Sequence, residues 1–290
     1  MQLNSQENTI RHTEFLIFDA MQPEIVTGTL VERVEMESAF LKRTVIVDFF
    51  LPKNVADPSD ISLLLINDGQ DMEKLGLEDM LNGLYENQSI TPLLCVAIHT
   101  CEDRKMEYGV AGQPDYLGRG AKAGLYTSYI LQELLPYIQT TYVLPTVHER
   151  GYAGFSLGAV SALDIAWSHP GLFTKVGIFS GSLWWRNIDQ TDPGYDDHQH
   201  RIVHQLLKNS PAVPGMQFFF QCGNLDETMD RNNNGIIDSI DDTLDLIDIL
   251  YKKGYTDKDV AYMEIADGRH DVPTWARAMP AFLKWGWGEK

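Results

Sequence analysis

The chain has 290 residues, of which 44% are hydrophobic and 22% charged, and this composition is typical of a globular protein with a large core. Its formal net charge of −18 argues against nucleic acids and membrane surfaces as partners, because both are anionic and would repel it. The first eight residues carry neither a basic nor a long apolar segment, and no later run is apolar enough to cross a membrane. We therefore expect no signal peptide, no membrane-spanning segment and a cytoplasmic location.

The three cysteines, Cys95, Cys101 and Cys222, lie in or beside apolar segments. Their odd number argues against a disulfide framework. We interpret all three as reduced core thiols, in agreement with a reducing compartment.

Segments rich in β-branched and aromatic residues predict antiparallel strands near the N-terminus, at 14–18, 25–34 and 44–50. Strands then alternate with helices, which implies a mostly parallel sheet with helices on both faces. The expected strands are 61–66, 93–98, 151–153, 175–179, 217–221 and 260–265. The expected helices are 78–85, 121–138, 159–166, 200–207, 243–251 and 274–285. We predict one domain over 1–290, with residues 1–50 as an antiparallel extension.

A serine stands at the centre of a glycine-flanked motif, Gly154-Phe155-Ser156-Leu157-Gly158. The motif joins a strand-forming segment to a helix-forming one, which predicts a strand, a sharp turn and a helix. Glycines are needed on both sides because such a turn leaves no room for Cβ atoms there. We therefore predict that Ser156 is a nucleophile at the N-terminus of a helix, where developing negative charge is favoured.

A serine hydroxyl needs a general base, and the base needs an acid that holds its tautomer. Of the five histidines after Ser156, His270 is the best candidate, because it follows the strand 260–265 at the sheet edge where catalytic groups collect. The alternative is a histidine that caps the last helix. The acid is expected after the strand 217–221, where we prefer Asp226 to Glu227. The other interpretation is that this carboxylate only caps a helix or a loop.

Two backbone amides are expected to form an oxyanion hole. One is the amide of Leu157, next to the nucleophile. The other is expected in the turn after the strand 61–66, from Gln70 or Asp71. The side chains of that turn are equally explained as ordinary turn formers.

Taken together, these motifs resemble one family, the putative-esterase group of α/β-hydrolases, which includes enterochelin esterases, S-formylglutathione hydrolases, feruloyl esterases and mycolyltransferases. The resemblance covers roughly residues 60–285. It rests on the serine motif and on Asn67-Asp68-Gly69-Gln70, Arg104 with Glu107-Tyr108, 133–138, 180–185, Cys222-Gly223 with Asp226-Glu227, and 268–271 with Trp275. It implies an α/β-hydrolase fold, a triad of Ser156, Asp226 and His270, and hydrolysis of carboxylic esters. Ala159 departs from the family, many members of which have a second glycine there.

An insertion over 226–242 is a larger departure from that family. Its residues 230–241 match the twelve-residue calcium loop, with oxygen-bearing side chains at positions 1, 3, 5, 9 and 12 and glycine at 6. We therefore expect a structural Ca²⁺ site formed by Asp230, Asn232, Asn234, the Ile236 carbonyl, Asp238 (directly or through water) and Asp241. The alternative is an acidic surface loop that caps the following helix.

Weaker signals concern three other groups of residues. His198, His200 and His204 would form a metal cluster if His200 and His204 shared a helix face, although a solvated helix explains them better. Of the adjacent Trp184 and Trp185, we expect one to pack and the other to line the acyl or alcohol pocket. Arg104 is a candidate for binding an anionic substrate, or it forms a structural ion pair with Asp103 or Glu107.

We therefore predict a serine esterase acting on a small-molecule ester or thioester, with no organic cofactor. An acyltransferase would use the same residues with a different acyl acceptor, so the sequence does not separate the two activities. A calcium-stabilised binding protein without catalysis is a third hypothesis, against which the intact set of triad residues argues. The physiological ester and the oligomeric state are not indicated by the sequence.

Overall fold

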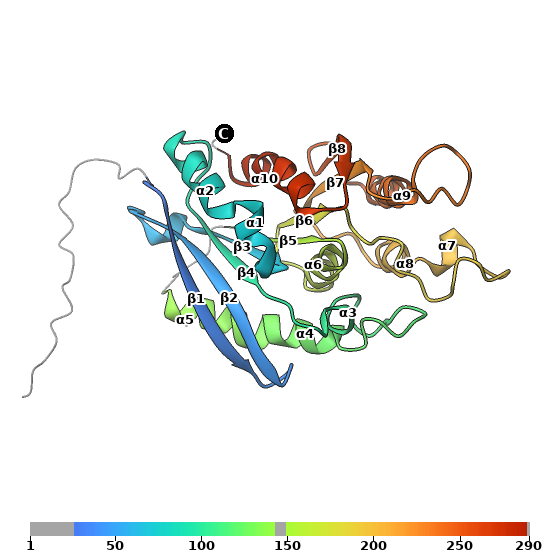
Figure 1. Cartoon of the computed structure of the whole chain (residues 1–290), viewed down its shortest axis with the longest axis horizontal. Coiled ribbons are helices and arrows are strands. Elements are labelled where there is room, and N and C mark those ends of the chain that lie inside the picture. The colour runs from blue at the N-terminus through green and yellow to red at the C-terminus, as the bar shows by residue number, and fades with distance from the viewer. Residues whose placement is uncertain (1–25, 143–148, 289–290) are drawn as a thin grey trace, which may run out of the picture.

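An eight-stranded mixed β-sheet forms the centre of the structure, a computed structural model that describes residues 26–142 and 149–288. The strand order is β1-β2-β4-β3-β5-β6-β7-β8, and Figure 1 shows the β1–β2 hairpin at one edge with β7 and β8 at the other. The strands are β1 (Thr29–Ser38), β2 (Arg43–Pro52), β3 (Ser62–Asn67), β4 (Leu93–Ile98), β5 (Arg150–Phe155), β6 (Lys175–Phe179), β7 (Gln217–Leu225) and β8 (Val260–Arg269). The strand expected at 14–18 lies outside the described residues.

The sheet begins antiparallel and continues parallel. β1 pairs with β2, and β2 pairs with β4, in antiparallel register, with Val47 opposite Ile98. All pairs from β4 through β3 to β8 are parallel. This arrangement confirms the predicted fold class, a mostly parallel sheet with antiparallel N-terminal strands.

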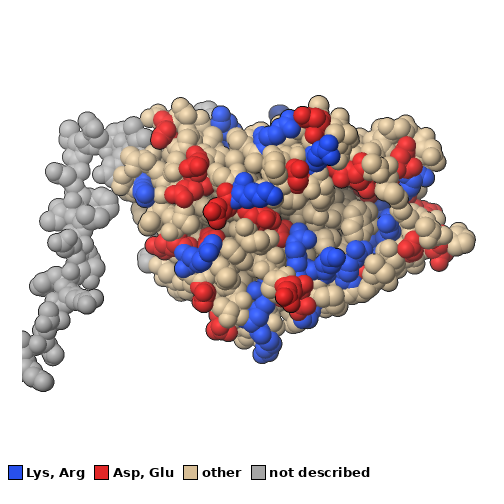
Figure 2. Space-filling model, viewed as in Figure 1, with Lys and Arg blue, Asp and Glu red and all other residues tan. Residues whose placement is uncertain are grey.

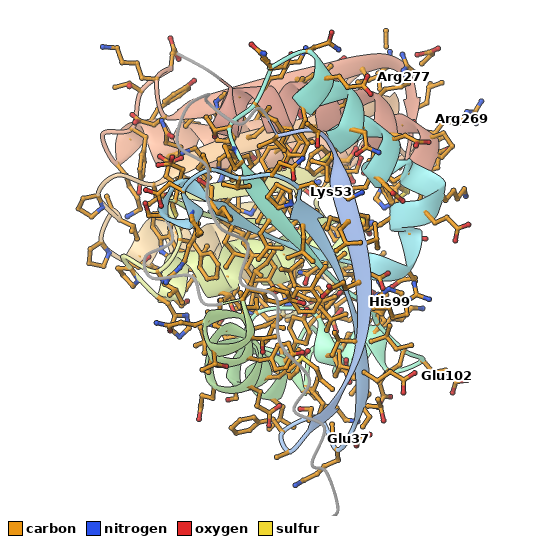
Figure 3. All side chains as sticks on the ribbon, turned by 90° about the vertical axis from the view of Figure 1, so that its left-hand side faces the viewer. Glu37, Lys53, His99, Glu102, Arg269 and Arg277 are labelled. Carbon is orange, nitrogen blue, oxygen red and sulfur yellow. The ribbon has the colours of Figure 1, made fainter. Side chains whose placement is uncertain are left out.

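Helices cover both faces of the sheet, as Figure 3 shows from the β1 edge. Side chains alternate along β3: Leu64 and Ile66 pack on one face and Leu63 and Leu65 on the other. The first face is covered by α1 (Met72–Leu75), α2 (Leu77–Glu86) and α10 (Val272–Trp287). The second is covered by α4 (Ala123–Tyr129), the π-helical segment η3 (Ile130–Leu134), α5 (Leu135–Thr141), α6 (Leu157–Ser168), α8 (Ile202–Asn209) and α9 (Asp238–Lys252). Short helical turns are η1 (Pro58–Asp60), η2 (Gly69–Asp71), α3 (Arg104–Glu107) and α7 (Asp197–His200).

Two predicted helices differ from the structure. The helix expected at 121–138 contains the π-helical segment η3 just before Pro136, which has no N–H to continue the α-helical pattern. The helix expected at 200–207 is broken at Arg201, whose backbone is extended (φ −77°, ψ 106°). The break turns the Arg201 guanidinium inward to Asp242 and Asp245, at 2.6 Å from each.

The cysteine interpretation is correct for two of the three thiols. Cys95 and Cys222 are buried, whereas Cys101 is exposed beyond the end of β4, so the expectation of a core position for Cys101 is wrong. In the part of the chain that the structure describes, no helix is both long and apolar enough to cross a bilayer.

Candidate active site

Ser156 stands on the turn between β5 and α6, in a conformation that side-chain-bearing residues rarely adopt, with φ 56° and ψ −121°. Its amide donates to the Phe179 carbonyl at 2.9 Å, and its carbonyl accepts from the Ser182 amide at 3.1 Å. These bonds fix the turn to the end of β6. The residue as a whole is half-buried.

The two glycines of the turn are required by packing. A Cβ atom on Gly154 would lie 2.3 Å from the carbonyl carbon and oxygen of Gly158. A Cβ atom on Gly158 would lie 2.8 Å from Asp68 Oδ2 and 3.0 Å from Asn67 Cβ. Real Cβ atoms hardly ever approach other atoms this closely, whether of the backbone as at Gly154 or of the well-packed Asn67 and Asp68 side chains as at Gly158, so the turn and its contact with the end of β3 both depend on glycine.

The Ser156 hydroxyl has one side-chain partner in the described residues, Ser182, at 3.2 Å between the two Oγ atoms. No hydrogen bond joins the His270 ring to Ser156 or to Asp226 in those same residues. Catalytic hydrogen bonds are often long or misaligned before substrate binds. The structure therefore leaves His270 near the site but without the direct contacts of an assembled triad.

Asp226 and His270 line one cavity of about 220 Å³, together with Ser182 and Trp184. Asp226 Oδ2 accepts the Gly223 amide at 3.1 Å, and its buried Oδ1 has no hydrogen-bond partner among the described residues. Burial raises the pKa of Asp226, while the nearby His270 charge opposes that shift. His270 is exposed as a residue, but partial desolvation of its ring lowers its pKa from the usual value, and the Asp226 charge opposes this shift. Each group therefore feels the charge of the other.

Glu227 lines the same cavity but has different neighbours. Its pKa is raised by burial and by the negative charges of Asp238 and Asp242 at the start of α9. The charges that act on Asp226 instead include His270 and Asp271. The two adjacent carboxylates therefore face different parts of the molecule.

The turn that follows β3 lies against the Ser156 turn. Asn67, fully buried, donates from Nδ2 to the Gly158 carbonyl at 2.7 Å. Its Oδ1 accepts the hydroxyls of Tyr126 and Tyr152 at 2.6 and 3.0 Å. Neither tyrosine was predicted to belong to the site, because its position among apolar residues in the sequence indicates burial but not contact with Asn67.

Arg104 forms a bidentate ion pair with Asp68, with Nε 2.6 Å from Oδ1 and Nη2 2.7 Å from Oδ2. The expected structural partners are wrong: Glu107 pairs with Arg43 and Asp103 with Lys122. Asp68 was missed because it lies far from Arg104 in sequence, and a single chain offers no signal for such a pairing.

The two adjacent tryptophans lie in different environments. Trp185 is fully buried, and its ring fills the space beside Gly109 and Gly120. Trp184 is half-buried and lines both the cavity of Asp226 and His270 and a neighbouring one of about 250 Å³. Arg119 and Arg186 lie 4.8 and 5.7 Å from the Trp184 ring centroid. Figure 2 shows a band of basic side chains across the face of the molecule that Figure 1 views, despite the net negative charge.

The loop of residues 230–237 extends beyond α9 at the end of the molecule opposite the β1–β2 hairpin (Figure 1). Asp230 accepts the amides of Asn234 and Gly235 at 3.1 and 2.9 Å. The side-chain amides of Asn232 and Asn234 both lie 2.8 Å from Asp241 Oδ2. Four of the six predicted ligand residues therefore gather where this loop meets the first turn of α9.

The other two predicted ligands lie at the edge of that group. Asp238 is buried, and its Oδ1 accepts the Arg231 amide at 2.8 Å. Ile236 is exposed, and its amide donates to Asn234 Oδ1 at 2.7 Å. No cluster of three or more His, Cys, Asp or Glu side chains suited to a metal ion occurs in the described ranges; the predicted loop differs because it also uses Asn oxygens and a backbone carbonyl.

The weaker histidine cluster does not assemble on one helix face. His200 ends α7, whereas His204 lies on α8 beyond the break at Arg201. His204 is buried and its Nε2 lies 2.8 Å from the Asp242 carbonyl oxygen. Burial lowers the pKa of His204 to about 3. The expectation of a solvated helix is therefore wrong for His204, which is a core residue.

Comparison with known proteins gives one family and several structural relatives. The sequence model of the family described as "Putative esterase" matches residues 38–285. The uncharacterized protein YbbA of Bacillus subtilis is 26% identical over 145 residues, which are 48% of this chain and 57% of YbbA. The chain therefore spans less than two thirds of that relative.

Solved structures share the fold at low sequence identity. The enterobactin esterase of Shigella flexneri, solved in the presence of 2,3-dihydroxy-N-benzoyl-glycine, aligns with a TM-score of 0.66 and 19% identity over 91% of this chain and 62% of that one. The siderophore hydrolase EstB of Aspergillus nidulans aligns with a TM-score of 0.64 and 15% identity over 92% and 97% of the two chains. These similarities establish a common fold.

Proposed function

The chain belongs to the "Putative esterase" family, and on this premise we propose that it is a serine hydrolase that cleaves carboxylic esters through an acyl-enzyme. The observation that carries the proposal is the conformation of Ser156, a residue with a side chain held at φ 56° on a strand-to-helix turn. Such backbone strain persists where the surrounding structure stabilises it, and it is common at active sites. Here it presents a hydroxyl at the N-terminus of α6.

In this mechanism the Ser156 hydroxyl attacks the ester carbonyl carbon while His270 accepts its proton. His270 then gives that proton to the leaving alcohol, and the acyl group remains on Ser156 Oγ. A water molecule, deprotonated by His270, then attacks the acyl carbon. The bond from that carbon to Ser156 Oγ breaks, Oγ takes the proton back from His270, and the acid is released. The lowered pKa of His270 supports the role of base, because the ring must be neutral when acylation begins and again when deacylation begins.

Asp226 is the proposed acid, and its surroundings support this choice over Glu227. Its Oδ1 is buried and free of hydrogen bonds in the described residues, so it is available to accept an N–H from the His270 ring. The His270 charge acts on Asp226, whereas Glu227 lies beside the start of α9.

The amides of Leu157 and Gln70 are the proposed oxyanion donors. The alternative donor, Asp71, already gives its amide to the Asp68 carbonyl at 3.0 Å, which favours Gln70. Leu157 is the first residue of α6, where backbone amides have no acceptor inside the helix.

We also propose that residues 230–241 bind Ca²⁺ in a structural role. The ligands would be Asp230, Asn232, Asn234, Asp241 and the Ile236 carbonyl, with Asp238 acting through water because Arg231 holds its carboxylate. Hard oxygen donors around a tight turn are what calcium prefers, and the gathering of four such side chains supports the proposal. Bound calcium would neutralise acidic residues that otherwise repel one another.

The substrate is a small-molecule ester or thioester. Trp184 is proposed to line the acyl or alcohol pocket, because it borders the cavity that contains Asp226 and His270. The structural relatives named as enterobactin esterase and siderophore hydrolase favour siderophore esters for the first trials. An acyltransferase is the second candidate function. Adding alcohols as competing acyl acceptors distinguishes the two, because an acyltransferase forms the new ester whereas a hydrolase releases the free acid.

A fluorophosphonate probe tests the proposed chemistry without knowledge of the substrate. The wild-type protein is expected to react at one site, Ser156, as located by peptide mass spectrometry, and to hydrolyse p-nitrophenyl acetate. The value of kcat/KM across siderophore, feruloyl, acyl-sugar and thioester substrates then identifies the substrate class. A protein that neither reacts with the probe nor hydrolyses any of these esters would contradict the proposal and favour a binding protein.

A further inference from the structure

We propose that the Arg104–Asp68 ion pair is a positioning element that holds the oxyanion turn, defined here as residues 67–71, against the Ser156 turn. The inference rests on the proposed function, because it assigns a catalytic consequence to the distance between these two turns. It gives Arg104 a role other than binding the substrate.

The pair connects the two turns directly. Besides its bidentate contact with Asp68, Arg104 Nη2 donates to the Phe155 carbonyl at 3.4 Å, one residue before the nucleophile. The Asp68 carboxylate also lies against the backbone after the nucleophile, since a Cβ atom on Gly158 would be 2.8 Å from Oδ2. One ion pair therefore contacts the Ser156 turn on both sides of the serine.

The conformation of Asp68 explains why this contact matters. Asp68 has φ 63°, in the left-handed region that few side-chain-bearing residues adopt, although aspartate does so more readily than most. Its amide lies 3.1 Å from the Tyr108 hydroxyl, and its carbonyl accepts the Asp71 amide at 3.0 Å. Because Gln70 lies inside that turn, any movement of Asp68 displaces the proposed oxyanion donor.

The pair is also well protected from water. The Asp68 side chain is 2% exposed and that of Arg104 is 28% exposed. A buried carboxylate left without its cation is strongly destabilised. Lysine cannot replace the guanidinium, because an ammonium group does not form two parallel hydrogen bonds with a carboxylate.

The substitutions Arg104→Lys and Asp68→Asn test the inference. Both are expected to lower kcat for p-nitrophenyl acetate about 10- to 100-fold, the range for losing part of an oxyanion contact, with a small change in KM. The affinity for a boronic-acid inhibitor, which forms a tetrahedral adduct on the serine, is expected to fall in parallel with kcat/KM. The double variant is expected to lose little more than either single variant, because both break the same contact.

Arg43→Lys is the matched control. Arg43 makes the same bidentate contact with Glu107, at 2.8 and 2.6 Å, and both carboxylate side chains are 2% exposed. Arg43→Lys is expected to lower the melting temperature to a similar extent and to leave kcat unchanged.

The outcomes separate this inference from the proposed function. Wild-type kcat in folded Arg104→Lys and Asp68→Asn would overturn the inference alone, as would an equal loss of kcat in Arg43→Lys. An increase in KM limited to anionic esters, with kcat retained, would make Arg104 a substrate-binding residue and also overturn it. Absence of probe labelling at Ser156 in the wild-type protein would overturn the proposed function itself.

Discussion

Gly223 and Gly268 pack backbone against backbone, so that the strand ends leading to Asp226 and His270 lie side by side. A Cβ atom on Gly223 would lie 2.5 Å from the carbonyl carbon and oxygen of Gly268, and one on Gly268 would lie 2.9 Å from Gly223 Cα. Gly223 also donates its amide to Asp226. The approach of β7 and β8 thus brings the proposed acid and base into one cavity.

The substitution Gly268→Ala is expected to separate these strand ends, because the added methyl group has no space. We expect destabilisation of about 1–3 kcal/mol, as for other overpacked sites, together with a loss of kcat/KM of at least about tenfold. Gly83→Ala is the control, since nothing lies within 4 Å of its Cβ position on α2. Equal activity and stability of the two variants would show that the approach of the strands is not needed.

The pH dependence of kcat/KM reports the protonation of His270. The base must be neutral, and partial desolvation lowers the pKa of His270 from its usual value, so activity is expected to decline only at a pH more acidic than that at which an ordinary histidine takes up its proton. An apparent pKa at or above 7 in the rate profile would contradict this assignment. In Asp226→Asn, any remaining activity should decline at still lower pH, because the negative charge that favours the imidazolium has been removed.

Conservative substitutions show which of the two neighbouring carboxylates, Asp226 or Glu227, acts as the triad acid. Asp226→Asn is expected to lower kcat by several orders of magnitude, because the amide leaves the His270 imidazolium unstabilised. Glu227→Gln is expected to change kcat only slightly. The reverse order, measured on the same aryl ester, would transfer the role of acid to Glu227.

The calcium proposal predicts a change in melting temperature. At a calcium concentration one hundred times Kd, binding would stabilise the fold by about 2.7 kcal/mol. Chelation is expected to lower the melting temperature, and Asp230→Ala to remove the response to calcium, while Ser156 labelling persists in the variant. A melting temperature that is indifferent to calcium, chelator and substitution would leave residues 230–241 as an ordinary surface loop.

The periodicity of apolar residues predicted the strands and helices well, because these elements depend mainly on residues that are close in sequence. The mostly parallel sheet and the positions of most strands and helices are as predicted. The glycines around Ser156 are needed for packing, as expected. Contacts between residues that are distant in sequence could not be predicted from such patterns. Arg104 contacts Asp68 instead of Asp103 or Glu107, and the helix predicted at 200–207 is broken at Arg201, which contacts Asp242. His204 became a core residue for the same reason, since its environment is provided by α9.

The most direct test of the proposed function compares Ser156→Ala with Ser168→Ala, a substitution on the same helix away from the cavity. Hydrolysis of p-nitrophenyl acetate is measured for both variants and for the wild-type protein. We predict that Ser156→Ala loses almost all activity, to within about 10³–10⁴ of the uncatalysed rate, whereas Ser168→Ala retains wild-type kcat/KM. If a folded Ser156→Ala retained most of the wild-type kcat/KM, Ser156 would not be the nucleophile and the proposed mechanism would be wrong.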